Sequence, residues 1–211
     1  MKRSAILGKI AASIILLSST LSLPAEDSEN PLNLPDFSAT QVLQTAKFPM
    51  TTKIYRSGSS VRIERSAALS TLYLPASSKV YNLTTYPDGS HQCVVMRPEQ
   101  AKMVPSPLEL LNGTNLKRTA SGTEVVDGHN CKVETVVVTR PDGTSIESKI
   151  WEAEDLKGAP VKIESQLPHE KLSAAFSDVV LGTPDKALFT PPAQCTPFEK
   201  MGQVAEHSVI P

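Results

Sequence analysis

Aromatic side chains are scarce in this chain: Phe, Trp and Tyr make up 5% of its 211 residues, and the single tryptophan is Trp151. An excess of basic charge is missing too, because 21 lysines and arginines stand against 22 acidic residues. Proteins that bind nucleic acid need a basic surface against the phosphates, and no basic stripe is visible here. We therefore expect no nucleic-acid partner.

The motifs of common enzymes and metal sites are also missing. The sequence contains no GxSxG, no HExxH, no CxxC pair and no glycine-rich phosphate loop. His91 and Cys93 lie two residues apart on one face of an expected strand, but a ligand set or a catalytic thiol needs a third group. The other histidines are scattered along the chain. We expect no metal, no cofactor and no enzymatic activity.

Long apolar runs are confined to the N-terminus, where residues 1–25 have the three parts of a secretory signal. Basic residues come first, an apolar run follows over residues 10–23, and Ala25 offers a small residue for cleavage. The run is short and interrupted for a membrane span. No cysteine stands near its end, so the lipid-attachment signal of a bacterial lipoprotein is missing. We expect a periplasmic or secreted protein with no integral membrane segment after cleavage.

Cysteine is rare, with three residues in the whole chain: Cys93, Cys131 and Cys195. In an exported protein, three cysteines allow one disulfide and leave one thiol. If the strands run up and down in chain order, the strand that begins at Cys131 starts at the edge where the last strand ends. We therefore predict a disulfide between Cys131 and Cys195, and three buried, unpaired thiols are the alternative.

Strand patterns are what the chain does contain. Over residues 145–151 apolar and polar side chains alternate, with Ile146 and Ile150 on one face and Trp151 on the other. An Asp-Gly pair between two such runs indicates a hairpin, because glycine accepts the positive φ of a tight turn. The pair occurs three times, at Asp88-Gly89, Asp127-Gly128 and Asp142-Gly143. The sequence therefore predicts a series of antiparallel hairpins.

One short helix is expected between two halves of this sheet. Ser106 fits the N-cap, Pro107 the first turn, and Glu109 the position that reaches back to the cap. Asn112-Gly113 supplies the stop. Three leucines, Leu108, Leu110 and Leu111, would face the sheet, either as permanent core or as a movable lid.

In that order, these features resemble the LolA-like superfamily of periplasmic lipoprotein carriers. The resemblance rests on the leucine helix at residues 104–111, the hairpin that contains Trp151, the strand at residues 156–163 and the LFTPP segment at residues 188–192. It is nearest to the uncharacterised DUF4412-type domains, in which segments like residues 122–131 and 151–156 recur. It covers roughly residues 37–195.

The resemblance implies an α+β, mainly antiparallel fold: a strongly curved, unclosed β-barrel with short helices over its concave face. Residues 26–36 would be a flexible lead-in, residues 37–195 the β domain and residues 196–211 a C-terminal tail. Acyl chains bind in the concavity of the carriers, where apolar area supplies the affinity. Candidates to line the cavity or its lid are Leu72, Leu74, Met96, Leu108, Leu110, Leu111 and Trp151.

The expected function is that of an exported, non-enzymatic binding protein that holds a lipid, an acylated lipoprotein or another apolar ligand in this cavity. The alternative is a periplasmic module of the same fold that binds an envelope protein or senses envelope state. In either case we expect a monomer. Lipid binding predicts an apolar cavity, whereas an interaction module predicts a filled one.

Overall fold

The computed structural model describes residues 32–44, 49–101, 106–111, 115–140 and 142–204. The expected signal sequence, most of the lead-in before residue 32 and the helix stop at Asn112-Gly113 lie outside these ranges. Within them, no helix reaches the length and hydropathy that a membrane crossing requires.

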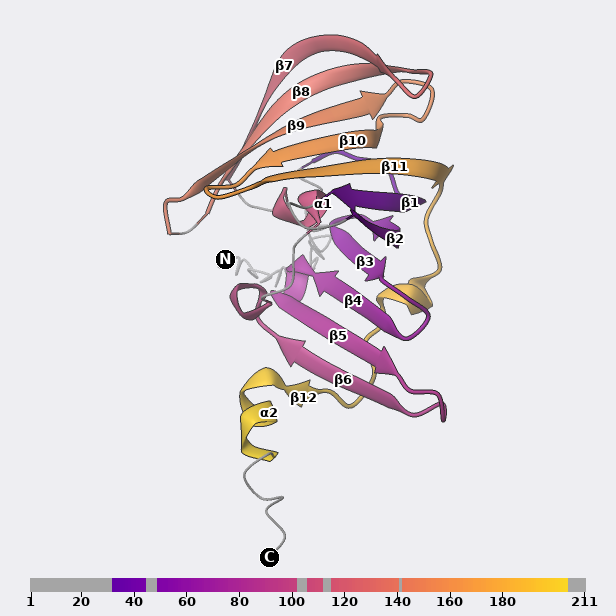
Figure 1. Ribbon diagram of the computed structural model, residues 1–211, viewed down its shortest axis with the longest axis vertical. Coiled ribbons are helices and arrows are strands. Elements are labelled where there is room, and N and C mark those ends of the chain that lie inside the picture. The colour runs from indigo at the N-terminus through magenta and orange to yellow at the C-terminus, as the bar shows by residue number, and fades with distance from the viewer. Residues whose placement is uncertain (1–31, 45–48, 102–105, 112–114, 141, 205–211) are drawn as a thin grey trace, which may run out of the picture.

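A single sheet accounts for nearly all of the structure, in the order β12-β6-β5-β4-β3-β2-β1-β11-β10-β9-β8-β7. Every neighbouring pair is antiparallel except β12 with β6. Figure 1 shows that the sheet curves strongly without closing, which confirms the predicted half-barrel. The strands are β1 (Phe37–Gln44), β2 (Pro49–Ser57), β3 (Ser60–Glu64), β4 (Leu69–Leu74), β5 (Lys79–Thr85), β6 (His91–Met96), β7 (Asn115–Val126), β8 (His129–Thr139), β9 (Ser145–Ala153), β10 (Ala159–Gln166), β11 (Lys171–Leu181) and β12 (Thr196–Pro197).

Helices are few and short, as expected. The α-helices are α1 (Pro107–Leu110) and α2 (Phe198–Val204), and the 3₁₀ turns are η1 (Pro75–Ser77), η2 (Pro98–Gln100) and η3 (Lys186–Phe189). In Figure 1, α1 lies inside the curve of the sheet, below β8–β11.

The predicted hairpin turns form where the Asp-Gly pairs stand. Between β7 and β8, Asp127 and Gly128 both have positive φ, at 50° and 85°, as a two-residue hairpin turn requires. Asp142 stabilises the turn between β8 and β9 through its side chain, because its carboxylate accepts a hydrogen bond from the Thr144 amide at 2.9 Å. Local chemistry therefore fixes where these strands begin and end.

The main core lies on the face against which α1 packs, which we call the helix-side face. Buried side chains from both halves of the sheet meet there, including Ile54 and Ile63 from β2 and β3 and Ile150 and Ile163 from β9 and β10. The halves are joined because β1 pairs with β11, far along the chain. One continuous apolar surface therefore runs across the join.

The opposite face carries a second, smaller core under the C-terminal segment. Phe189 of η3 and Cys195 pack on Leu72, Tyr81 and Cys93 there. The disulfide joins Cys93 to Cys195, and Cys131 is a buried free thiol, so the predicted Cys131–Cys195 pairing is wrong. The prediction assumed strands in chain order, whereas the chain after β11 crosses back to the β6 edge, away from β8.

Candidate ligand-binding face

The start of α1 is built as the sequence predicts. The Ser106 hydroxyl accepts a hydrogen bond from the Leu108 amide at 3.3 Å, and the Ser106 amide donates to Glu109 Oε2 at 2.8 Å. This reciprocal capping box, with Pro107 in the first turn, lets a helix of four residues form. The Ser106 hydroxyl also donates to Gln41 Oε1 of β1 at 2.8 Å, which ties the helix start to the sheet.

The three leucines at this helix are buried against the helix-side face. Leu108 and Leu111 are 0% exposed and belong to the main core, and Leu110 is 7% exposed and packs with Ile146 and Leu172. Leu108 and Leu111 thus belong to one buried cluster with apolar side chains from both halves of the sheet. The leucines occupy the region of the helix-side face where we expected either permanent core or a lid over a ligand.

Met96 joins the same face at the β6 side. It pairs with Val80, which pairs with Tyr73, which pairs with Val61 of the main core. Side chains directly opposite each other on paired strands share a face, so Met96 points to the helix side, where it is buried. Of the predicted lining residues, the structure therefore brings Met96 and the α1 leucines to one face.

Polar groups lie on this face beside the leucines. The Arg65 guanidinium donates to Thr71 Oγ1 at 2.5 Å, and the Thr71 hydroxyl donates to Asn82 Oδ1 at 2.9 Å. Burial raises the pKa of Glu109, although the Ser106 amide and Arg65 act in the other direction. Burial, and secondarily Glu109, raise the pKa of Tyr73. The helix therefore places an acid in an apolar region.

A Glu109→Gln variant is expected to have a higher free energy of unfolding than the wild type at neutral pH, and so to be more stable. Glutamine keeps the acceptor for the Ser106 amide but carries no charge into the face. Because the pKa of Glu109 is raised in the folded protein, its ionised form costs stability above that pKa, and the cost disappears as the pH falls to the ordinary glutamate range. Urea unfolding across this pH interval measures the difference.

The matched control is Glu147→Gln, at an exposed position on β9. That change should leave the free energy of unfolding nearly the same at neutral pH, because the side chain is exposed. A Glu109→Gln variant less stable than the wild type at neutral pH would contradict the assignment of a half-buried carboxylate whose charge costs stability.

Trp151, Leu72 and Leu74 do not lie on the helix-side face, so their prediction as lining residues is wrong. Ile150 belongs to the main core, and successive side chains on a strand point to opposite faces, so Trp151 points away from α1. Leu72 and Leu74 pack under the C-terminal segment instead. Alternation indicated which residues share a face, but the sequence did not reveal which face α1 would cover.

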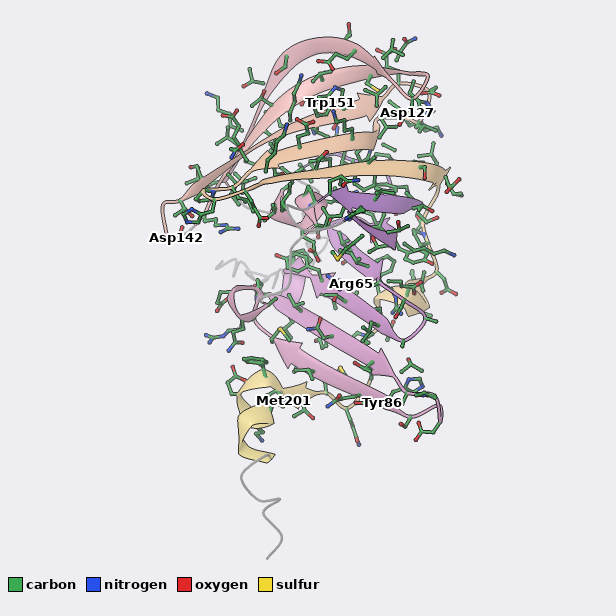
Figure 2. All side chains as sticks on the ribbon, in the orientation of Figure 1. Arg65, Tyr86, Asp127, Asp142, Trp151 and Met201 are labelled. Carbon is green, nitrogen blue, oxygen red and sulfur yellow. A yellow bond between two sulfur atoms is a disulfide. The ribbon has the colours of Figure 1, made fainter. Side chains whose placement is uncertain are left out.

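Trp151 is clamped on the opposite face. Its indole Nε1 donates to Glu124 Oε2 of β7 at 2.8 Å, and the ammonium groups of Lys149 and Lys162 lie 4.6 and 4.5 Å from the ring centroid. Hydrogen bonds from Lys149 and Trp151 lower the pKa of Glu124. These contacts link β9, which carries Trp151, to β7 and β10. Figure 2 shows Trp151 among the upper strands of the sheet.

A buried ion network on the helix-side face was missed in the sequence. Arg118 of β7 binds Glu134 of β8 and Glu152 of β9, the latter at 2.6 Å, and it also donates to the Leu32 carbonyl. Burial works against the charged form of Arg118, but the two carboxylates outweigh it and raise the pKa of the guanidinium. The two carboxylates lie 16 and 34 residues from Arg118 in sequence and the Leu32 carbonyl lies 86 residues from it, and no local signal connects these groups.

Two cavities lined by described residues lie elsewhere. One of about 330 Å³ is lined by Thr123, Glu124, Val125, Asn130, Cys131 and Glu154, and one of about 100 Å³ lies beside residues 66–70. Burial raises the pKa of the Cys131 thiol, which favours the unreactive, protonated form. Among the described residues, no cluster of three His, Cys, Asp or Glu side chains could hold a metal ion.

Comparison with known proteins gives likeness at the level of structure. No family model and no curated protein match the sequence. The lipoprotein LppX of Mycobacterium tuberculosis is 13% identical, with a TM-score of 0.37, over 74% of this chain and 92% of that one. A LolA superfamily protein of Nitrosomonas europaea is 11% identical, with a TM-score of 0.33, over 75% and 91%.

MucB, solved in complex with MucA from Pseudomonas aeruginosa, is 18% identical with a TM-score of 0.36. The match covers 76% of this chain but 57% of the other, so the chain spans little more than half of that structure. Scores this low carry no argument about function. What the chain can bind must therefore be argued from its own residues.

Proposed function

We propose that this chain is an exported, non-enzymatic binding protein that holds the acyl chain of a lipid or of an acylated protein against the helix-side face. The observation that carries the proposal is the burial of Leu108, Leu110 and Leu111 by one helical turn that joins the apolar surfaces of both half-sheets. An acyl chain would take the place of these leucines, with α1 as the lid.

The energies of the two states are comparable. Burying a leucine side chain contributes about 1.5–3 kcal/mol, so the three leucines contribute about 5–9 kcal/mol to keeping α1 in place. A buried methylene group contributes about 0.8 kcal/mol, so roughly six to eleven methylenes would offset the loss. A single acyl chain of ordinary length has enough apolar surface to exchange with α1.

Export is supported by the cysteines. The Cys93–Cys195 disulfide fits an oxidising compartment such as the periplasm or the extracellular space. Together with the signal pattern of residues 1–25, it favours a place where lipids and acylated proteins are carried between membranes.

The test is to produce the protein from its full sequence with export, purify it gently, and analyse organic extracts by mass spectrometry. We expect bound lipid, and saturable binding of a fluorescent fatty acid to the delipidated protein. A Leu108→Glu variant should lose both, because its carboxylate would lie where the chain binds. Acyl groups released only after hydrolysis of a co-purified protein would indicate an acylated protein as the ligand.

The matched control is Leu74→Glu, the same change on the opposite face, which should keep fatty-acid binding. Circular dichroism melting of each variant separates lost binding from lost folding. Leu110→Gln is a milder change among the three leucines, and it provides a second measurement of fatty-acid binding. A wild-type protein that carries no lipid and binds no fatty acid would refute the proposal.

A second candidate is a module that binds an envelope protein. The filling of the helix-side face by the α1 leucines favours it, because a permanent plug leaves no room for a ligand. In that case the Leu108→Glu change would lower the free energy of unfolding without removing any bound lipid. Cross-linking in intact cells would capture a partner protein, and extraction of lipids would not change that capture.

A further inference from the structure

The two edge regions of the sheet differ in whether another strand pairs with them. At one edge, β6 is covered by β12, which pairs with it in parallel and is anchored by the Cys93–Cys195 disulfide. At the other edge, the outer side of β7 pairs with no strand of the described ranges. This strand of twelve residues forms the upper rim of the sheet in Figure 1. Natural proteins seldom leave such an edge open, because its backbone amides and carbonyls can pair with another chain.

A bulge divides β7 into two halves. Ala120 pairs with Glu134 and Gly122 with Val133, so no residue of β8 lies directly opposite Ser121 in the register. Before the bulge, Lys117 and Thr119 point to the opposite face. After it, Gly122 and Glu124 do so, and the odd and even positions have exchanged faces.

This exchange makes the edge self-complementary. We propose that β7 pairs antiparallel with β7 of a second copy, around a two-fold axis between Ala120 and Ser121, so that the sheet continues across two molecules. In this register Lys117 lies opposite Glu124 of the second copy, and Leu116 lies opposite its Val125. Each pair occurs twice because the contact is symmetric.

In this register the paired side chains lie on the same face of the sheet, both on the helix-side face and on the opposite one. Lys117 and Glu124 are exposed on the opposite face, whereas Leu116 and Val125 are on the helix-side face, where Val125 is 70% exposed. In a regular strand, this register would place side chains from opposite faces against each other. The bulge at Ser121 removes the mismatch, because both strands carry it at the axis.

Opposite charges therefore meet at Lys117 and Glu124, and apolar side chains meet at Leu116 and Val125. Cross-strand pairs of opposite charge and apolar pairs stabilise a sheet, and like charges directly opposite destabilise it. A contact of two strands is small, so the dimer is expected to be weak and to dissociate on dilution. The proposal replaces the monomer expected from the sequence.

The test is a complementary charge swap, followed by sedimentation velocity over a range of concentrations. Lys117→Glu places two glutamates opposite each other twice, and Glu124→Lys does the same with lysines. Each variant alone should dimerise about tenfold more weakly than the wild type. An equimolar mixture should recover the dimer, because each protomer then supplies the charge that the other needs.

Lys53→Glu is the matched control, since Lys53 is exposed on β2 in the middle of the sheet. It should leave dimerisation unchanged. Because Glu124 also holds Trp151, Val125→Lys tests the same register without touching that contact, and it should weaken the dimer. A wild type that stays monomeric at high concentration, or charge variants whose mixture does not recover the dimer, would overturn the proposal.

Discussion

Replacing Arg118 with methionine should lower the free energy of unfolding by about 3–5 kcal/mol. Methionine keeps most of the apolar stem but leaves the carboxylates of Glu134 and Glu152 on the helix-side face without their shared cation. Lys132 still pairs with Glu134, so Glu152 bears the larger loss. Urea unfolding followed by the fluorescence of Trp151, the single tryptophan, measures the effect.

The pH dependence of this loss has a definite sign. In the wild type, burial opposes the charged form of Glu134, but Lys132 and Arg118 outweigh it and lower its pKa, so its contribution to stability is present above the ordinary glutamate pKa. This contribution is lost as the pH falls through the lowered pKa. Burial raises the pKa of Glu152 even beside Arg118, so without Arg118 its charged form costs still more stability at neutral pH, and that cost disappears when the group is protonated in acid. The difference between wild type and variant should therefore be largest at neutral pH and shrink in acid.

Arg97→Met is the matched control. The Arg97–Glu99 pair is 65% exposed on both sides, and such pairs contribute about 0–1 kcal/mol. An Arg118→Met variant that lost no more stability than this control, with no dependence on pH, would show that the network does not stabilise the fold.

Local chemistry explains which parts of the fold could be predicted. The turn at Asp127-Gly128 and the capping box from Ser106 to Glu109 depend on residues within a few positions of each other. Alternation likewise placed Ile150 and Trp151 on different faces of one strand. Each of these features is encoded in a window of sequence shorter than one element.

The candidate site depended on distant contacts and was predicted only in part. The α1 leucines and Met96 lie together on the helix-side face, whereas Trp151 points away from it. The reason is that period-two alternation gives the relative faces of side chains along a strand, but does not show which of the two faces α1 covers. The pairing of β1 with β11 has no local signal either.

The disulfide pairing also depends on contacts between residues distant in sequence, and its effect on stability can be measured. A Cys93→Ala/Cys195→Ala variant is expected to lose about 4–5 kcal/mol of unfolding free energy, because the bridge joins residues 102 positions apart and restricts the unfolded chain accordingly. Thermal and urea unfolding of the oxidised wild type and the variant measure the loss. The reduced wild type should unfold like the variant, since both lack the cross-link.

Peptide mapping without reduction provides the direct check on the pairing. A peptide that joins Cys93 to Cys195 is expected, with Cys131 recovered as a thiol. The bridge also holds η3 and β12 against the β4–β6 half of the sheet, so its removal should expose the amides of β6 to hydrogen exchange before those of β8. A peptide that joins Cys131 to Cys195 would instead require the C-terminal segment to cross to β8, and it would contradict the strand order of the sheet.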